Sequence, residues 1–60
     1  MMSETEWVKT KSVWIKHLYY LKGDGSLPYQ TTVLARPNSS SDERDIILSK
    51  EKVSFKNEII

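Results

Sequence analysis

The chain has 60 residues, a formal net charge of +1 and no cysteine. It is therefore one domain at most, no disulfide stabilises it, and a zinc site built from cysteine and histidine is excluded because His17 is its one histidine. Domains this small bury only about 60% of the surface that their unfolded chains expose. They usually depend on a disulfide, a metal or a partner chain, so we expect self-association or binding to a larger protein.

The sequence also indicates where in the cell the protein acts. The first residues, MMSETEW, are acidic and lack the apolar segment of a signal peptide. No apolar run approaches the ~20 residues that span a bilayer. Absence of cysteine fits a reducing compartment. These features predict a cytoplasmic protein with no membrane partner, acting in the host cytoplasm if its source is a virus.

Two structures compete for the N-terminal third of the chain. Residues 1–6 are expected to be a flexible tail, but Ser3–Glu6 also matches the S-x-x-E capping box that begins helices. Four apolar residues then follow at helical spacing: Trp7, Trp14, Leu18 and Leu21. The alternative fold is therefore α+β, with an N-terminal helix that ends near Lys22.

The strand interpretation rests on Val13–Leu21, VWIKHLYYL, the densest apolar and aromatic run of the chain. Its β-branched and aromatic residues suit a pleated sheet, and it contains no alanine. We therefore favour a strand. Alternation then places one set of residues on each face: Val13, Ile15, His17, Tyr19 and Leu21 on one, Trp14, Lys16, Leu18, Tyr20 and Lys22 on the other.

A hairpin is predicted next, with its turn at Gly23–Ser26 and its returning strand at Tyr29–Ala35. A two-residue loop at Asp24-Gly25 would pair Tyr20 with Tyr29, Leu18 with Thr31 and Trp14 with Ala35. A three-residue loop with a glycine bulge would instead place Val13, Ile15, Tyr19 and Leu21 on one face with Tyr29, Thr31, Val33 and Ala35. A slip of one residue exchanges core and surface, so the sequence leaves the core face open.

The C-terminal half is predicted to be a loop at residues 37–44 followed by two short strands, Asp45–Ser49 and Val53–Lys56. The contiguous apolar residues of DIILS suggest a buried strand, and VSFK alternates. The whole chain, residues 1–60, is thus expected to be a single, mostly β domain. A small antiparallel sheet or barrel of four or five strands, SH3-like or OB-like, would suit this pattern.

No constellation typical of an enzyme is present. A Ser-His-Asp site needs a base oriented by an acid, and His17 lies among apolar residues. The carboxylates of Asp42, Glu43 and Asp45 fall in a polar stretch without apolar shelter. The glycines around Asp24 lack the third glycine of a dinucleotide-binding loop. We expect no catalytic residue, no metal site and no cofactor.

The aromatic residues instead favour a binding protein. Tyrosine and tryptophan bury a large apolar area while keeping a polar group, which enriches them at interfaces. We expect a small non-enzymatic protein-interaction module, a regulator or inhibitor that binds a host or partner protein. Its expected anchors are Trp7, Trp14, Tyr19 and Tyr20.

The alternative is a nucleic-acid-binding module. Single strands bind where basic side chains follow the backbone and aromatic rings stack on bases. The stretch from residue 9 to 22 mixes both kinds, and its candidate residues are Lys9, Lys11, Trp14, Lys16, Tyr20 and Lys22. A net charge of only +1 argues against strong binding to phosphates.

Overall fold

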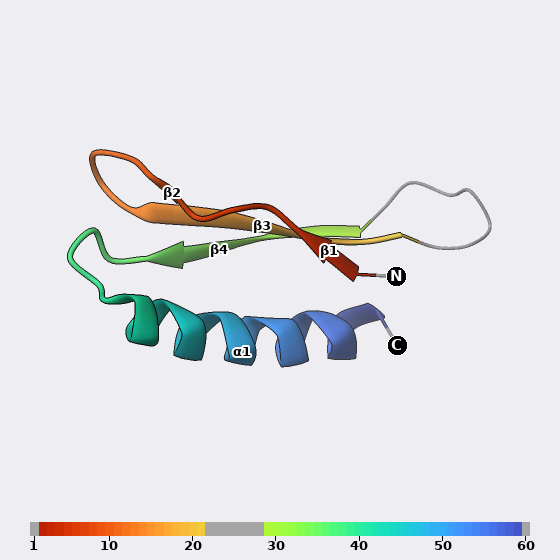
Figure 1. The fold of residues 1–60 in the computed structure, drawn as a ribbon. Helices are drawn as coiled ribbons and strands as arrows, with labels where there is room; N and C mark the ends of the chain where they lie inside the picture. The colour runs from red at the N-terminus through yellow and green to blue at the C-terminus, as the bar shows by residue number, and fades with distance from the viewer. Residues whose placement is uncertain (1, 22–28, 60) are drawn as a thin grey trace.

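The computed structural model describes residues 2–21 and 29–59 and consists of one antiparallel sheet and one helix (Figure 1). The central strand β3 pairs with β1 and β2 along one side and with β4 along the other. The sheet is open and three strands wide, and α1 runs alongside β4 (Figure 1). The elements are β1 (Met2–Glu4), β2 (Val8–Lys9), β3 (Trp14–Tyr20), β4 (Tyr29–Ala35) and α1 (Ser41–Ile59).

The register between β3 and β4 is the one predicted from a two-residue loop. Tyr20 lies opposite Tyr29, Leu18 opposite Thr31, and Trp14 opposite Ala35. The alternative register is wrong, and the turn at Gly23–Ser26 itself lies outside the described residues. Leu18 is fully buried against the helix, so the even-numbered residues of β3 face α1. The odd-numbered residues face away from it.

A one-residue bulge separates β1 from β2. Glu4 lies opposite Leu18 and Val8 opposite Ile15, so three residues of the first strand face two of β3. Thr5 fills the irregular position: its N–H donates to the His17 carbonyl at 3.0 Å, and its Oγ1 accepts the His17 N–H at 3.0 Å. The bulge changes which residues point toward the helix, so that Trp7 packs against the core.

The helix α1 begins at a capping residue, Ser40. Ser40 Oγ accepts the N–H of Glu43 at 3.2 Å, and its carbonyl accepts the N–H of Arg44 at 3.0 Å. The acidic first turn, with Asp42 and Glu43, and Lys56 in the last turn complement the helix dipole. Of the two S-x-x-E sequences, Ser40–Glu43 is therefore the one at a helix start: Ser40 caps the helix, and the Glu43 side chain pairs with Arg36.

Several expectations from the sequence are wrong. The segments Asp45–Ser49 and Val53–Lys56, which we expected to be strands, lie within α1. Residues 41–44, expected to be part of the loop at 37–44, also belong to this helix. Met2–Glu4 form β1, so this part of residues 1–6 is not a tail. The N-terminal helix ending near Lys22 is wrong because β1, β2 and β3 occupy that segment. The SH3-like or OB-like barrel is also wrong, because the sheet is not closed.

The core is small. Leu18, Val33 and Phe55 are 0%, 1% and 4% exposed and form one cluster between the sheet and the helix. Half-buried apolar side chains surround it: Met2, Trp7, Tyr20, Ile47, Leu48 and Ile59. All of this packing lies on one face of the sheet, and none of the described helices and strands covers the other face.

Candidate functional site

The face of the sheet that points away from α1 is the main candidate site, and we call it the open face. Cross-strand pairing places Val8, Ile15 and Leu34 side by side across the three strands, and we call them the apolar row. Val8 is 58% exposed and Leu34 is 56% exposed, although both lie within strands. Adjacent exposed aliphatic side chains on a regular sheet typically mark a binding surface.

A polar row lies next to the apolar row. His17 is opposite Thr32, and its Nδ1 lies 3.3 Å from Thr32 Oγ1 and 3.5 Å from Gln30 Nε2. The His17 and Tyr19 rings are 6.4 Å apart between centroids and tilted by 41°. These contacts link neighbouring side chains of β3 and β4 across the open face.

Among the residues that the structure describes, the strand positions of the open face hold no aspartate, glutamate, lysine or arginine. Its strand positions follow from the pairing: Ser3, Val8, Ile15, His17, Tyr19, Gln30, Thr32 and Leu34. The charged residues of the same strands, Glu4, Lys9 and Lys16, point to the helix side. The open face is therefore apolar at one end and neutral polar at its centre.

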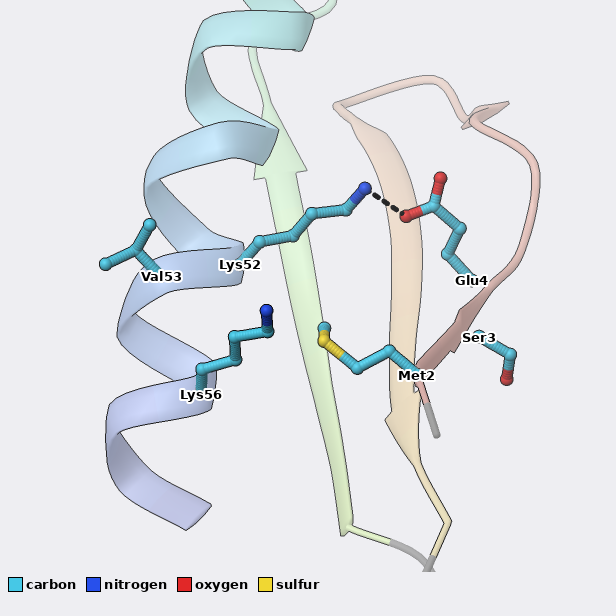
Figure 2. Close-up of a pocket in the computed structure, with 6 residues that line it drawn as sticks. All are labelled: Met2, Ser3, Glu4, Lys52, Val53 and Lys56. Atoms are coloured by element: carbon cyan, nitrogen blue, oxygen red, sulfur yellow. Dashed lines mark ion pairs between the residues drawn. The ribbon is translucent and has the colours of Figure 1, made fainter. Parts of the chain in front are cut away.

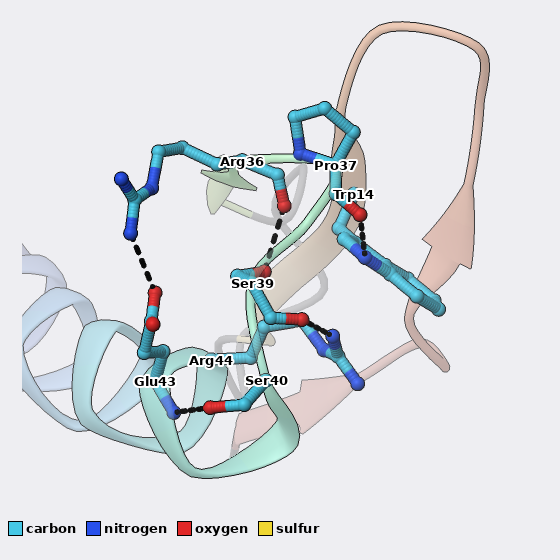
Figure 3. Close-up of polar contacts among 7 residues, drawn as sticks. All are labelled: Trp14, Arg36, Pro37, Ser39, Ser40, Glu43 and Arg44. Atoms are coloured by element: carbon cyan, nitrogen blue, oxygen red, sulfur yellow. Dashed lines mark hydrogen bonds and ion pairs between the residues drawn. The ribbon is translucent and has the colours of Figure 1, made fainter.

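Most of the aromatic anchors expected from the sequence lie on the helix side. Trp14 is half-buried, its indole N–H donates to the Pro37 carbonyl at 3.2 Å (Figure 3), and the Arg44 guanidinium lies 4.0 Å from its ring centroid. Trp7 and Tyr20 pack against the core. Of the four expected anchors, only Tyr19 lies on the open face.

Arg44 organises the connection between β4 and α1. Its Nη1 donates to the Ser39 carbonyl at 2.7 Å, and Ser39 Oγ donates to the Arg36 carbonyl at 2.7 Å. Arg36 in turn forms a 2.9 Å ion pair with Glu43, as Figure 3 shows. Sequence reasoning missed Arg44; the capping motif just before it was the available signal, since a helix starting there would have placed Arg44 in its first turns.

The candidate residues for nucleic acid are dispersed. Lys16 is only 7% exposed and lies 3.6 Å from Glu4 and 5.7 Å from the Trp7 ring centroid. Lys9 lies 5.9 Å from the Trp14 ring centroid, and Lys11 is exposed before β3. Trp14 and Tyr20 are on the helix side, as described above, and Lys22 lies outside the described residues. Among the candidates that the structure describes, Lys9 lies beside Trp14, but no single free surface gathers all of them.

A groove of about 380 Å³ lies between β1 and α1 (Figure 2). Its lining residues are Met2, Ser3, Glu4, Lys52, Val53 and Lys56. Lys52 Nζ reaches across the groove to Glu4 Oε2 at 2.8 Å, and this hydrogen bond is the main reason that the pKa of Glu4 is lowered. The charge of Lys16 lowers this pKa further, while partial burial opposes the shift. Because two ammonium groups hold the carboxylate ionised, Glu4 is poorly suited to act as a general base.

Within residues 2–21 and 29–59, no three histidine, cysteine or acidic side chains gather where they could hold a metal ion. In the same part of the chain, no helix combines the length and the apolar character needed to cross a bilayer. Comparison with protein family models, curated proteins and solved structures finds no match to this chain.

Proposed function

We propose that this protein is a small, non-enzymatic interaction module that binds a protein partner through its open face. The observation that carries the proposal is the exposed apolar row, which lies on a face where no described strand residue is charged. Isolated exposed aliphatic residues are common on protein surfaces, whereas a contiguous set on a regular sheet face is a typical interaction site.

The chemistry of the open face favours protein over nucleic acid. Affinity for nucleic acids depends on lysine and arginine side chains that contact phosphates. The cations of the strands point to the other side of the sheet, and Lys16 is buried beside Glu4. An apolar row flanked by hydroxyl, amide and imidazole groups suits a partner surface of mixed aliphatic and neutral polar character.

Tyr19 and Leu34 would be central contacts in such a complex. Tyr19 is half-buried against its neighbours, so little side-chain entropy is lost when a partner covers it. Leu34 is more exposed and gains more from burial. A module of this size acts by occupying a surface, which is how a regulator or inhibitor works. Its lack of cysteine agrees with a role in the cytoplasm.

The test is affinity capture with the tagged protein, with and without nuclease treatment. The variant Val8→Glu/Leu34→Glu places two charges on the open face. The control Ile46→Glu/Val53→Glu places the same charges on α1, away from the open face, at residues that are 58% and 62% exposed. We expect the wild type and the control to retain a protein partner after nuclease treatment, and the open-face variant to lose it. A partner that the open-face variant retains would contradict the proposal, as would one that nuclease releases.

A further inference from the structure

We propose that a second copy of this chain covers the open face, so that two sheets pack face to face with their helices on the outside. This inference rests on the proposed function, because it names the partner of the same face. Stacked sheets about 10 Å apart are a common architecture, and a two-fold axis between them would bring each open face against an identical one.

The open face is self-complementary. Since its described strand residues include no aspartate, glutamate, lysine or arginine, a second copy brings none of these charges against its own kind there. A two-fold arrangement can set the apolar row of one copy against that of the other. The neighbouring hydroxyl, amide and imidazole groups of Thr32, Gln30 and His17 then meet groups that both donate and accept hydrogen bonds.

The size of the open face sets the expected strength of such a dimer. The face spans the seven residues each of β3 and β4 and the shorter strands β1 and β2, of three and two residues, and it covers roughly 300 Å² in projection. Two such faces bury roughly 600 Å² before the relief of the side chains is counted. That area is below the about 1,000 Å² of a stable biological interface, so we expect a weak dimer.

The size of the core supplies the reason for association. Three nearly fully buried side chains form the core cluster of the described residues, all on the helix side of the sheet. Small domains with so little buried area are usually stabilised by an additional element. Covering the apolar row in a dimer would build a second apolar layer from Val8, Ile15 and Leu34 of each copy.

The first test is sedimentation of the purified chain from about 10 μM to about 1 mM, the range in which a weak dimer forms. We expect the mass to rise from 7.0 kDa toward twice that value. Val8→Glu/Leu34→Glu should weaken the dimer by at least about tenfold per buried charge, while Ile46→Glu/Val53→Glu should leave it unchanged. Circular dichroism checks that both variants are folded, as expected for substitutions at exposed positions.

The second test uses the absence of cysteine to place single spin labels. Leu34→Cys and Ile46→Cys are matched, because the native residues are 56% and 58% exposed. Face-to-face sheets should bring Leu34 labels within about 20 Å, whereas labels on the two outer helices should lie beyond about 35 Å. A dimer that lacks the short Leu34 distance, or that only the Ile46/Val53 variant weakens, would overturn the inference.

A chain that stays at 7.0 kDa at about 1 mM would also overturn the inference, since even a weak dimer should then be populated. It would not overturn the proposed function, which the capture experiment judges by whether a different protein depends on Val8 and Leu34. Conversely, Val8→Glu/Leu34→Glu could weaken the dimer while the capture experiment finds no other protein. That result would identify self-association as the function of the open face.

Discussion

Glu4 joins three elements of the fold, and its replacement by glutamine should measurably destabilise the protein. From β1, its carboxylate lies 3.6 Å from Lys16 Nζ on β3 and 2.8 Å from Lys52 Nζ on α1. The side chain of Lys16 is only 9% exposed, so its ammonium group has little water to replace the carboxylate. Glutamine keeps the size of the side chain and removes its charge.

The solvent exposure of Glu4, Lys16 and Lys52 sets the size of the stability loss that we expect for Glu4→Gln. Removing one partner of a fully buried ion pair costs about 3–5 kcal/mol. A pair exposed to solvent is worth about 0–1 kcal/mol because water and salt screen it. Glu4 is 37% exposed and Lys52 is 42% exposed, so the pair with Lys52 lies near the exposed limit. The pair with Lys16 lies between the limits, and we expect a total loss of about 1–2 kcal/mol. For a domain of this size, that lowers the melting temperature by roughly 5–15 °C.

The effect should depend on pH in a defined direction. The pKa of Glu4 is lowered in the folded state, mainly by the hydrogen bond from Lys52, so the unfolded chain binds the proton more readily. The stabilisation is fully present above the unfolded pKa, about 4.3, and is lost as the pH falls through the lower folded value. The difference between wild type and Glu4→Gln should therefore be largest at neutral pH and should shrink below pH 4.

The assay is thermal and urea unfolding of both proteins at pH 7 and pH 3, at low and high salt. Glu6→Gln is the control, because this substitution removes the same charge from an exposed residue. If Glu4→Gln and Glu6→Gln unfold at the same midpoint at pH 7, the reasoning about Lys16 is refuted. A difference that persists unchanged at pH 3 would show that charge is not its cause.

Two further substitutions test the start of α1. Ser40→Ala removes the hydroxyl that accepts the Glu43 N–H, and it should lower the free energy of unfolding in urea by about 1 kcal/mol. The control Ser41→Ala, at the first helical position, should lower it far less. Equal losses in the two variants would mean that the helix starts elsewhere. Arg44→Lys keeps the charge but removes the planar contact with the Trp14 ring and the hydrogen bond to the Ser39 carbonyl. We expect the free energy of unfolding to fall by about 1–2 kcal/mol and the tryptophan fluorescence to shift. An unchanged fluorescence spectrum and unfolding midpoint would contradict the contact.

The strands β3 and β4 follow from local sequence. Alternating β-branched and aromatic residues predict β3 and β4, and the confirmed register is one of the two that the turn at Asp24-Gly25 allows. The helix was missed because Ile46, Ile47 and Leu48 are contiguous, which is typical of a buried strand. In addition, long charged side chains interrupt the apolar pattern of α1 at positions that are half-buried in the structure. These half-buried residues include Arg44, Glu51 and Lys52.

The sequence by itself determined the two paired strands β3 and β4 and limited their register to two alternatives. Tertiary structure alone decided which face of the sheet is the core, because both faces of β3 carry apolar and aromatic residues. It also decided which of two S-x-x-E motifs begins a helix: Ser3–Glu4 pair with β3, whereas Ser40 precedes a segment that packs across β4. Local sequence predicts strands and turns because the spacing of apolar residues and the residue types of a turn are local properties. Burial depends on contacts between distant residues, here Phe55 of the helix with Leu18 and Val33 of the sheet.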